Sequence, residues 1–596
     1  MIAALRATRE KRTYNRWVAD ETMEDFALRF TARRARRWSY GRVANTAIGS
    51  ISFLALEAIG AVLTLTYGFD IAIAAIMFVG AILFLTGLPI SYYAARYGLD
   101  IDLLTRGAGF GYVGSTITSL IYASFTFIFF ALEAAILALA LEFCLGIPLF
   151  VGYVVSSLVA IPLVIHGFSK ISTFQTWTQP LWILLHMLPF VFLAFVGYDI
   201  DSWTSFSGTL GPAEAPDAAR LLMFGAATGV VFSLVAQIGE QVDFLRFLPE
   251  PQTREDQRKW WAALFVAGPG WSVLGVLKML AGSYLVTLAL REGVPAADAT
   301  DPTRMYFVAF DQFIASPALV LLLTGIFVVL SQLKINVTNA YAGSIAWSNF
   351  FSRLTQTHPG RVVWLIFNVG IALLLMELGV FTGLEHVLGV YSHVALAWIG
   401  ALVADLVVNK PLGLSPKGIE FRRAYLYDIN PVGIGSMVLA CILAFMAYAG
   451  MFGPMLQAFS AASALATSFV LAPLIAWGTG GKYYIARPKT ETYTGVTSCT
   501  VCDYQFDAED MIDCPFHAAP ICSLCCTLET GCHDVCKPHA RLTRMVENGI
   551  YTLFPWPVAR ALLTQTATAI FATTVISVMF GGVLLAIRAL ASTANF

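Results

Sequence analysis

The chain has 596 residues, of which 58% are hydrophobic and 13% are charged, and its mean hydropathy is +0.71. Soluble globular proteins carry about 25% charged residues, so the composition excludes an ordinary soluble domain and predicts an all-α polytopic protein in a lipid bilayer. The net charge of −1 provides no bulk attraction to nucleic acid.

Residues 1–45 form a polar, basic segment ahead of the first apolar stretch, and no cleavable signal peptide is visible in it. A cluster of arginines stands at its end: Arg33, Arg34, Arg36 and Arg37. Positive residues beside a span favour the cytoplasmic side, so the cluster is predicted to set the topology. Binding of lipid headgroups and docking onto another domain are the alternatives.

Residues 46–480 contain apolar stretches of about the length that a membrane-crossing helix needs. Loops rich in Lys and Arg alternate with loops poor in both, which predicts a cytoplasmic N-terminus and a cytoplasmic segment after residue 480, with the chain in the inner membrane. Twelve spans are predicted, near 46–66, 71–94, 113–142, 147–166, 179–197, 221–240, 261–289, 313–334, 362–380, 387–408, 432–450 and 456–477.

The first and sixth predicted spans share two features, glycines and an acidic residue. Gly49 and Gly60 flank Glu57 in the first span, and Gly239 precedes Glu240 in the sixth. Matching interruptions in two five-span halves are typical of an inverted repeat with broken helices. A five-plus-five repeat is therefore predicted.

Four stretches resemble a known family in their order and spacing. They are RGAGFGYVGSTITSL at 106–120, VDFLRF at 242–247, LSQLKINVTNAYAGSIAWSN at 330–349 and LGVYSHVALAWIGALVADLVVNK at 388–410. Over about three quarters of the chain, this pattern is similar to the nucleobase:cation symporter-1 family, the cytosine and purine permeases. The resemblance implies a LeuT-type fold and secondary transport of a nucleobase-like heterocycle.

In that family a flat ligand stacks between aromatic rings among broken spans one and six and spans three and eight. The resemblance places the substrate-binding residues at Phe129, Glu133, Phe232, Ser233, Gln237, Asn336 and Asn339. Four-residue spacing sets the first two on one helix face. The site is more acidic than a cytosine site, which favours a donor-rich or cationic ligand facing Glu133. Alternatively, Glu133 is the structural partner of a buried cation.

LeuT-type symporters hold a sodium ion between unwound span one and span eight, and Ser331 and Lys334 fall at the matching place. The Lys334 ammonium is predicted to replace the ion, with Glu57 as its counter-ion. Transport would then be independent of sodium and linked to protons, with Glu240 as a further carboxylate. The alternative is that Lys334 snorkels to the cytoplasmic surface. Lys278 in span seven is interpreted as structural.

After a linker at 481–498, residues 499–540 hold eight of the ten cysteines. Thiolates and imidazoles at this spacing suit Zn²⁺; the predicted ligands are Cys499/Cys502, Cys514/His517, Cys522/Cys525 and Cys532/Cys536, with Cys526, His533 and His539 spare. Two ions fit, one arrangement being cross-braced with the first and third pairs on one ion. An iron–sulfur cluster, disulfides and a redox switch are the alternatives, although cytoplasmic thiols stay reduced.

Residues 541–596 are predicted to form an interfacial segment and a thirteenth span at 559–587. The chain lacks a P-loop, a nucleophile elbow and a helix with paired zinc histidines, so an enzyme is not predicted. Two hypotheses remain. One is a permease for a nitrogenous heterocycle. The other is a transporter-like sensor, similar to the input domain of a sensory histidine kinase, that signals to a cytoplasmic partner through its Cys-rich module.

Overall fold

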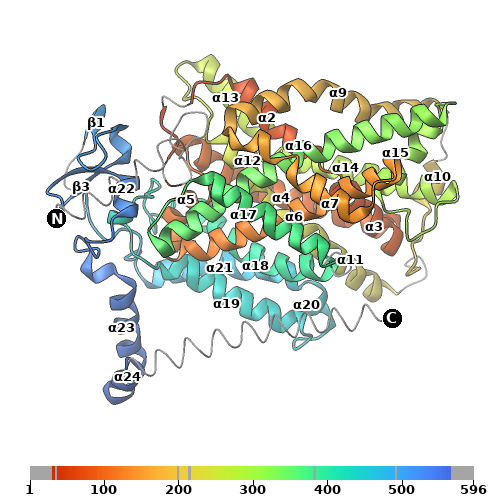
Figure 1. Cartoon of the computed structure of the whole chain (residues 1–596). Coiled ribbons are helices and arrows are strands. Elements are labelled where there is room, and N and C mark those ends of the chain that lie inside the picture. Colours follow the sequence, from red (N-terminus) through yellow and green to blue (C-terminus); the bar gives the residue numbers. More distant parts are fainter. Residues whose placement is uncertain are drawn as a thin grey trace.

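Long apolar helices build most of the molecule, and a small mixed module lies at one end of the bundle (Figure 1). The computed structural model describes residues 28, 30–33, 36–196, 200–211, 216–379, 384–489 and 493–564. Within these residues, nine helices are long and apolar enough to cross a membrane, and a bent pair makes a tenth. The predicted all-α polytopic class is therefore confirmed.

Apolar helices occupy all twelve predicted span positions. They are α2 (Tyr40–Gly49) with α3 (Ala55–Tyr67), α4 (Phe69–Tyr97), α6 (Ser115–Leu145), α7 (Leu149–Leu158) with α8 (Ile161–Ile165), α9 (Gly167–Val196), α11 (Asp217–Phe232) with α12 (Gln237–Leu245), α14 (Trp271–Arg291), α16 (Pro317–Thr355), α17 (Arg361–Glu377), α18 (Leu384–Ala404), α19 (Pro431–Tyr448) and α21 (Ser460–Gly478). The fourth and ninth positions hold the shorter helices, so the number of crossings stays a prediction.

Short helices connect the long ones. They are α5 (Ile101–Thr105), α10 (Ile200–Thr204), α13 (Arg254–Ala267), α15 (Pro302–Asp311) and α20 (Pro454–Ala458), with π-helical turns at Arg106–Phe110 and Asp405–Asn409. The eighth span was predicted to end at 334, whereas α16 continues to Thr355. Hydropathy falls there because the helix becomes polar, yet its polar side chains, such as Asn339 and Ser344, stay buried between neighbouring helices.

Helices separated by five spans pack in equivalent ways. The first span, through α3, packs on α14, the seventh, and the sixth span, through α11, packs on α4, the second. The third and eighth spans, α6 and α16, which are also five spans apart, pack along each other. This exchange of partners is what a five-plus-five inverted repeat predicts, because each half supplies the same surfaces to the other.

The contact between α3 and α14 depends on two glycines. A Cβ atom added at Gly60 would collide with the main chain of Met279, and one added at Gly282 would collide with the main chain of Glu57. Small residues let membrane helices approach closely without a side chain between them. The two glycines therefore bring the backbone of α14 directly against the first turns of α3.

Two of the spans are interrupted. The first changes from α2 through a 3-10 turn at Ser50–Ser52 to α3, with a bend of 45°. The sixth passes through a 3-10 turn at Ser233–Ala236 between α11 and α12. The predicted interruptions are present, but the first one precedes Glu57, which lies in the opening turn of α3, where the helix dipole favours a negative charge.

The C-terminal module contains two small antiparallel sheets. β1 (Val496–Ser498) pairs with β2 (Gln505–Asp507), and β3 (Met511–Cys514) pairs with β4 (Ala519–Cys522), which leads into α22 (Ser523–Leu528). Two helices follow, α23 (Leu542–Leu553) and α24 (Trp556–Leu562). Most of the predicted segment 1–45 and most of the predicted thirteenth span lie outside the described residues.

Candidate functional site

A buried ion pair occupies the interruption of the first span. The ammonium of Lys278, on α14, lies 2.9 Å from a carboxylate oxygen of Glu57 and donates to the main-chain oxygen of Ser52 at 3.2 Å. The side chains are 4% and 0% exposed. A positive charge thus stands between an unwound carbonyl and the opening turn of α3, where it satisfies both groups.

Further polar side chains surround this pair. The hydroxyl of Tyr306 donates to Glu57 at 3.2 Å and lies 2.9 Å from Nδ1 of His186. The His186 ring stacks on Trp182, and the Lys278 ammonium lies 5.4 Å from the centroid of the Trp182 ring. Glu57 is therefore held by partners from α9, α14 and α15, in addition to its own helix.

The interruption is also bonded to α16. The Ser52 hydroxyl donates to the main-chain oxygen of Ser331 at 2.8 Å, and the amide of Leu54 donates to the Gln332 side chain at 3.4 Å. Trp182 donates its indole N–H to the Ser331 hydroxyl at 3.0 Å. Ser331 and its neighbour therefore meet the unwound segment, which is where the sequence predicted an ion site.

The predicted pair of Lys334 with Glu57 does not form. The Lys334 ammonium donates to the main-chain oxygen of Gln175 at 3.3 Å and to the Thr178 hydroxyl at 3.1 Å, both on α9. Lys334 is fully buried, so it does not snorkel to a surface either. The physical reason is its helix face: Lys334 faces α9, whereas Lys278, expected to be structural only, faces the interruption.

Two more carboxylates are buried near the interruptions. Glu133 faces the Gln332 side chain and the backbone of Ala55, yet within the described part of the chain neither of its oxygens has a hydrogen-bond partner. Glu240 accepts a hydrogen bond from Gln237 at 3.0 Å through one oxygen only. A buried carboxylate oxygen without a hydrogen bond is costly, so Glu133 and Glu240 are each expected to accept a further hydrogen bond from a donor.

The predicted aromatic residues lie in the core beside these carboxylates. The Phe129 ring packs on Phe125, with a centroid distance of 4.4 Å, and is 2% exposed. Phe232 is fully buried at the end of α11. Ser233 donates to the main-chain oxygen of Val230 at 2.7 Å, so its hydroxyl stabilises the turn between α11 and α12.

The two predicted asparagines of α16 differ in their surroundings. The Asn336 amide lies against the main chain of Phe130 and Ala134, where it joins α16 to α6. Both polar atoms of the Asn339 side chain are buried, and neither has a partner among the described residues. Asn339 is thus the one of the two with free hydrogen-bonding capacity, and the roles of both in binding stay predictions.

Sequence reasoning missed Trp182, His186 and Tyr306, and it interpreted Lys278 as structural without naming its partner. Trp182 and His186 are four residues apart on α9, which puts them on one helix face. A lysine in mid-span was the available signal, since a buried cation needs a partner. The identity of that partner could not be read from the sequence, because the three elements around Glu57 are far apart in the chain.

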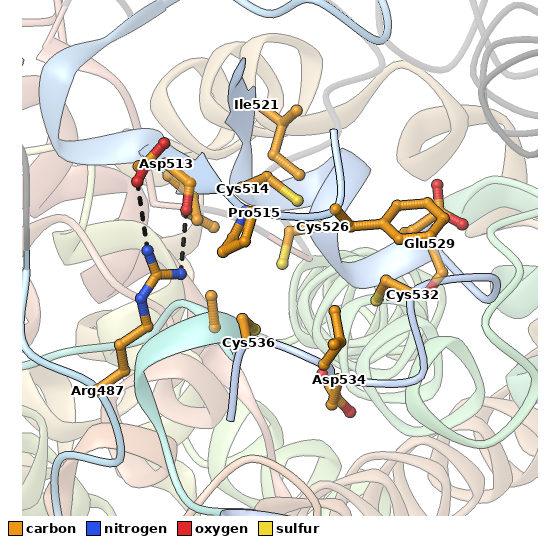
Figure 2. A pocket seen from close by; sticks show the side chains of 14 residues that line it. Arg487, Asp513, Cys514, Pro515, Ile521, Cys526, Glu529, Cys532, Asp534 and Cys536 are labelled. Atoms are coloured by element: carbon orange, nitrogen blue, oxygen red, sulfur yellow. Dashed lines mark hydrogen bonds and ion pairs between the residues drawn. The ribbon is translucent and has the colours of Figure 1, made fainter. Parts of the chain in front are cut away.

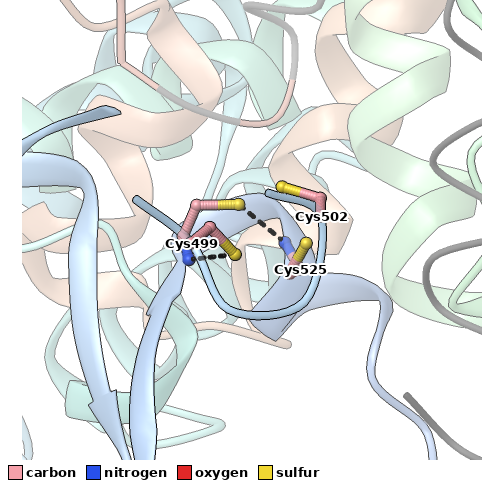
Figure 3. Close-up of side chains that lie close together, drawn as sticks. Cys499, Cys502 and Cys525 are labelled. Atoms are coloured by element: carbon pink, nitrogen blue, oxygen red, sulfur yellow. Dashed lines mark hydrogen bonds between the residues drawn. The ribbon is translucent and has the colours of Figure 1, made fainter. Parts of the chain in front are cut away.

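Four cysteines of the C-terminal module form a compact cluster. The sulfurs of Cys499, Cys502, Cys522 and Cys525 all lie within 4.8 Å of one another (Figure 3). The amides of Cys522 and Cys525 donate to cluster sulfurs at 3.3 and 3.4 Å. Because the neighbouring Cys502 thiol stabilises its thiolate, the pKa of Cys499 is strongly lowered. The first and third predicted pairs therefore lie together, and the set suits a tetrahedral ion.

No protein-family model matches the chain, and no curated protein matches it in sequence. Among solved structures, it is similar to Mhp1, a nucleobase-cation-symport-1 family transporter, in a closed conformation with bromovinylhydantoin bound, with a TM-score of 0.55, 16% identity, and coverage of 76% of this chain and 96% of that chain. For the inward facing conformation of Mhp1 the TM-score is 0.53 and the identity 18%, with the same coverage. Over about three quarters of its length, the chain therefore has the LeuT-type fold that its sequence predicted.

Proposed function

We propose that the protein is a secondary active transporter for a nucleobase-like nitrogenous heterocycle that is cationic or rich in hydrogen-bond donors. The supporting observation is the excess of carboxylates around the two interruptions. Glu57, Glu133 and Glu240 are all fully buried there, and Lys278 pairs with Glu57 alone. A ligand with several N–H groups would supply the donors that Glu133 and Glu240 lack.

The aromatic neighbours fit the same class of ligand. Phe129 and Phe125 present rings on α6, one and two turns before Glu133. Stacking of flat rings provides affinity for any π-system, and hydrogen bonds to the edge of the ligand provide selectivity. Asn339, with its unused amide, is the proposed second group that reads the edge.

Transport is proposed to be independent of sodium. The Lys278 ammonium already carries the positive charge at the unwound carbonyl of Ser52, where a mobile cation would otherwise be needed. A proton is then the proposed coupling ion, carried by the buried carboxylates. The helical bundle is proposed to lie in the inner membrane, with the module and the N-terminal segment on its cytoplasmic side. The distribution of basic loops supports this orientation.

The deciding experiment is uptake into proteoliposomes. A labelled panel of cytosine, uracil, adenine, hypoxanthine, allantoin, hydantoin and thiamine-like amines is offered with an inward gradient of sodium, or of potassium at equal ionic strength. One compound is expected to accumulate equally under both salts, and faster with an inward proton gradient. Accumulation that requires sodium would refute the proposed role of the lysine, and no accumulation of any compound would refute transport of this class.

A ligand sensor is the second candidate, and one observation favours it. The module is bonded to the loop between α18 and α19: Arg422 donates to the main-chain oxygen of Met511 at 2.7 Å, and Lys537 pairs with Asp428 at 2.7 Å. A change in the bundle would therefore reach the module directly. Ligand-dependent hydrogen exchange in residues 499–540, without any uptake, would favour the sensor.

The first cysteine cluster is proposed to hold a structural zinc ion. Its four sulfurs match the closed, four-coordinate sites in which zinc supplies folding free energy and no chemistry. The module is small and its sheets are two-stranded, so it depends on such an ion for its stability.

A further inference from the structure

The remaining four cysteines of the module also gather in one place. Cys514, Cys526, Cys532 and Cys536 line a single small cavity, and their side chains are directed toward its centre (Figure 2). Cys514 and Cys526 are 9% and 8% exposed, and the other two are partly buried. The cavity measures about 10 Å³, which is room for about one water-sized atom.

These cysteines come from separate segments of the module. Cys514 ends β3, Cys526 lies in α22, and Cys532 and Cys536 flank the tight turn that follows. Within that turn, His533 and Asp534 have positive φ angles of 44° and 51°, which fold the backbone back so that both thiols face the same space. No part of the cavity belongs to the first cysteine cluster.

His517 was predicted from the sequence to pair with Cys514 as a metal ligand, but its side chain does not point into this cavity. Its Nε2 atom lies 3.1 Å from Glu529, and the histidine does not line the cavity. Cys526, which the sequence left spare, takes the fourth position instead. The difference arises because α22 carries two adjacent cysteines. Cys525 belongs to the first cluster, and Cys526 lines the cavity.

The charges around the cavity are mixed. A divalent ion with four thiolates has a net charge of −2, and one arginine and three carboxylates, Asp513, Glu529 and Asp534, line this cavity. Arg423 donates to the main-chain oxygens of Cys526 and Glu529 at 3.0 and 2.9 Å, and Arg487 lines the cavity. Each arginine is also paired with a carboxylate of the lining, Arg423 with Asp534 at 2.9 Å and Arg487 with Asp513 at 3.3 Å. The gathering of the four thiols, and not the charge around them, therefore supports a metal centre here.

We propose that the module holds a second structural zinc ion, bound by Cys514, Cys526, Cys532 and Cys536 and cross-braced with the first. Binding replaces four thiol protons by four Zn–S bonds of about 2.3 Å. In the described residues only the first cluster has all its sulfurs within 4.8 Å of one another, so the second set closes onto its ion by small side-chain rotations into the cavity. This ion would stiffen the segments that Arg423 holds.

The test is the metal content of purified full-length protein, by inductively coupled plasma mass spectrometry, with cobalt substitution to report the ligands. Two zinc ions per chain are expected, and both cobalt ions should show the intense sulfur-to-metal absorption of four-thiolate sites. Cys526→Ser should lower the zinc content to one, whereas His517→Gln should keep two. Cys144→Ser, in the membrane helix α6, is the matched control and should also keep two.

Several outcomes would overturn the proposal. They are one zinc per chain in the unaltered protein, a zinc content that falls with His517→Gln but not with Cys526→Ser, and iron in place of zinc. If the Cys526 variant cannot be purified, thiol counting decides the question. The denatured, metal-free protein should react at ten thiols, and a deficit of two would indicate a disulfide among the four cysteines instead of an ion.

Discussion

At the scale of single residues, Lys278 defines the candidate ion site. Its ammonium is almost completely buried, and its two partners are the Glu57 carboxylate and the Ser52 carbonyl. The main-chain oxygen is free to accept because the helix is interrupted at that point. A fixed ammonium in this position cannot leave with the substrate, which is why it would make transport independent of sodium.

The pair of Lys278 and Glu57 is expected to behave as a unit. Lys278→Met leaves Glu57 as an uncompensated buried charge and should destabilise the folded protein by about 3–5 kcal/mol. Lys278→Met combined with Glu57→Gln removes both charges, and much of the stability should return. Thermal unfolding of the three variants in detergent measures this. Additive losses in the double variant would contradict a direct ion pair.

Glu133 is expected to bind ligand without supporting the fold. Since neither of its oxygens has a hydrogen-bond partner among the described residues, Glu133→Gln should leave the melting temperature of the free protein unchanged or higher. The loss of a charged hydrogen bond should weaken ligand binding by about tenfold or more. Isothermal titration with the transported compound gives both affinities.

The matched control is Glu142→Gln, which alters an exposed carboxylate on the same helix. It should change neither quantity. If Glu133→Gln binds ligand normally and melts at a lower temperature, the carboxylate is a structural partner of a cation, which is the alternative that its sequence position left open.

At the scale of elements, the close packing of α3 on α14 sets the position of the ion pair. Gly60 and Gly282 allow the two backbones to touch, and Lys278 lies one turn before Gly282 on α14. The depth at which Lys278 meets the unwound segment is therefore fixed by two residues that carry no side chain. A wider spacing would separate the ammonium from the Ser52 carbonyl.

A single methyl group on this interface should have a measurable effect. Gly282→Ala is expected to destabilise the protein by about 1–3 kcal/mol, because the new Cβ would overlap the main chain of Glu57. Gly229→Ala in α11 is the control, since no atom lies within 4 Å of a Cβ built there. Melting temperatures of both variants make the comparison. Equal values would show that α3 and α14 can separate without cost.

At the scale of the whole molecule, the module and the bundle form a single connected structure. Arg423 bonds the loop before α19 to α22 and to Asp534 at 2.9 Å, and α22 also packs against α16. α16 is the helix that carries Ser331 and Asn339. One continuous helix therefore runs from the candidate site to the metal module.

Removal of metal should unfold the module and leave the bundle folded. Structural zinc contributes about 10–16 kcal/mol to the folding of small zinc domains, whereas the bundle holds its own apolar core. Hydrogen exchange of the full chain after chelation should therefore rise in residues 499–540 and in the loop at 410–430, with protection kept in α6 and α16. Unchanged exchange in a sample proved free of metal would refute a structural role for the ion.

The sequence by itself determined the fold class, the positions of the apolar helices and the cysteine pairs of the module, although not which pairs share an ion. These depend on local quantities: hydropathy over about 20 residues, and two-residue cysteine spacing that lets both thiols reach one ion. The interruptions of spans one and six were also visible, because glycine and a carboxylate in an apolar stretch conflict with a continuous lipid-facing helix.

Only the tertiary structure decided which charges meet. Lys278 and Lys334 are both lysines in apolar helices. Lys334 lies on the face of α16 that packs on α9, whereas Lys278 lies on the face of α14 that meets the interruption of the first span. Cys525 and Cys526 are neighbours in sequence, yet they serve different cysteine sets. For the lysines the partner comes from an element far away in the chain, and for the cysteines the rotation of α22 decides which set each thiol joins. The rotation and packing of helices, which local sequence does not encode, therefore determine the contacts.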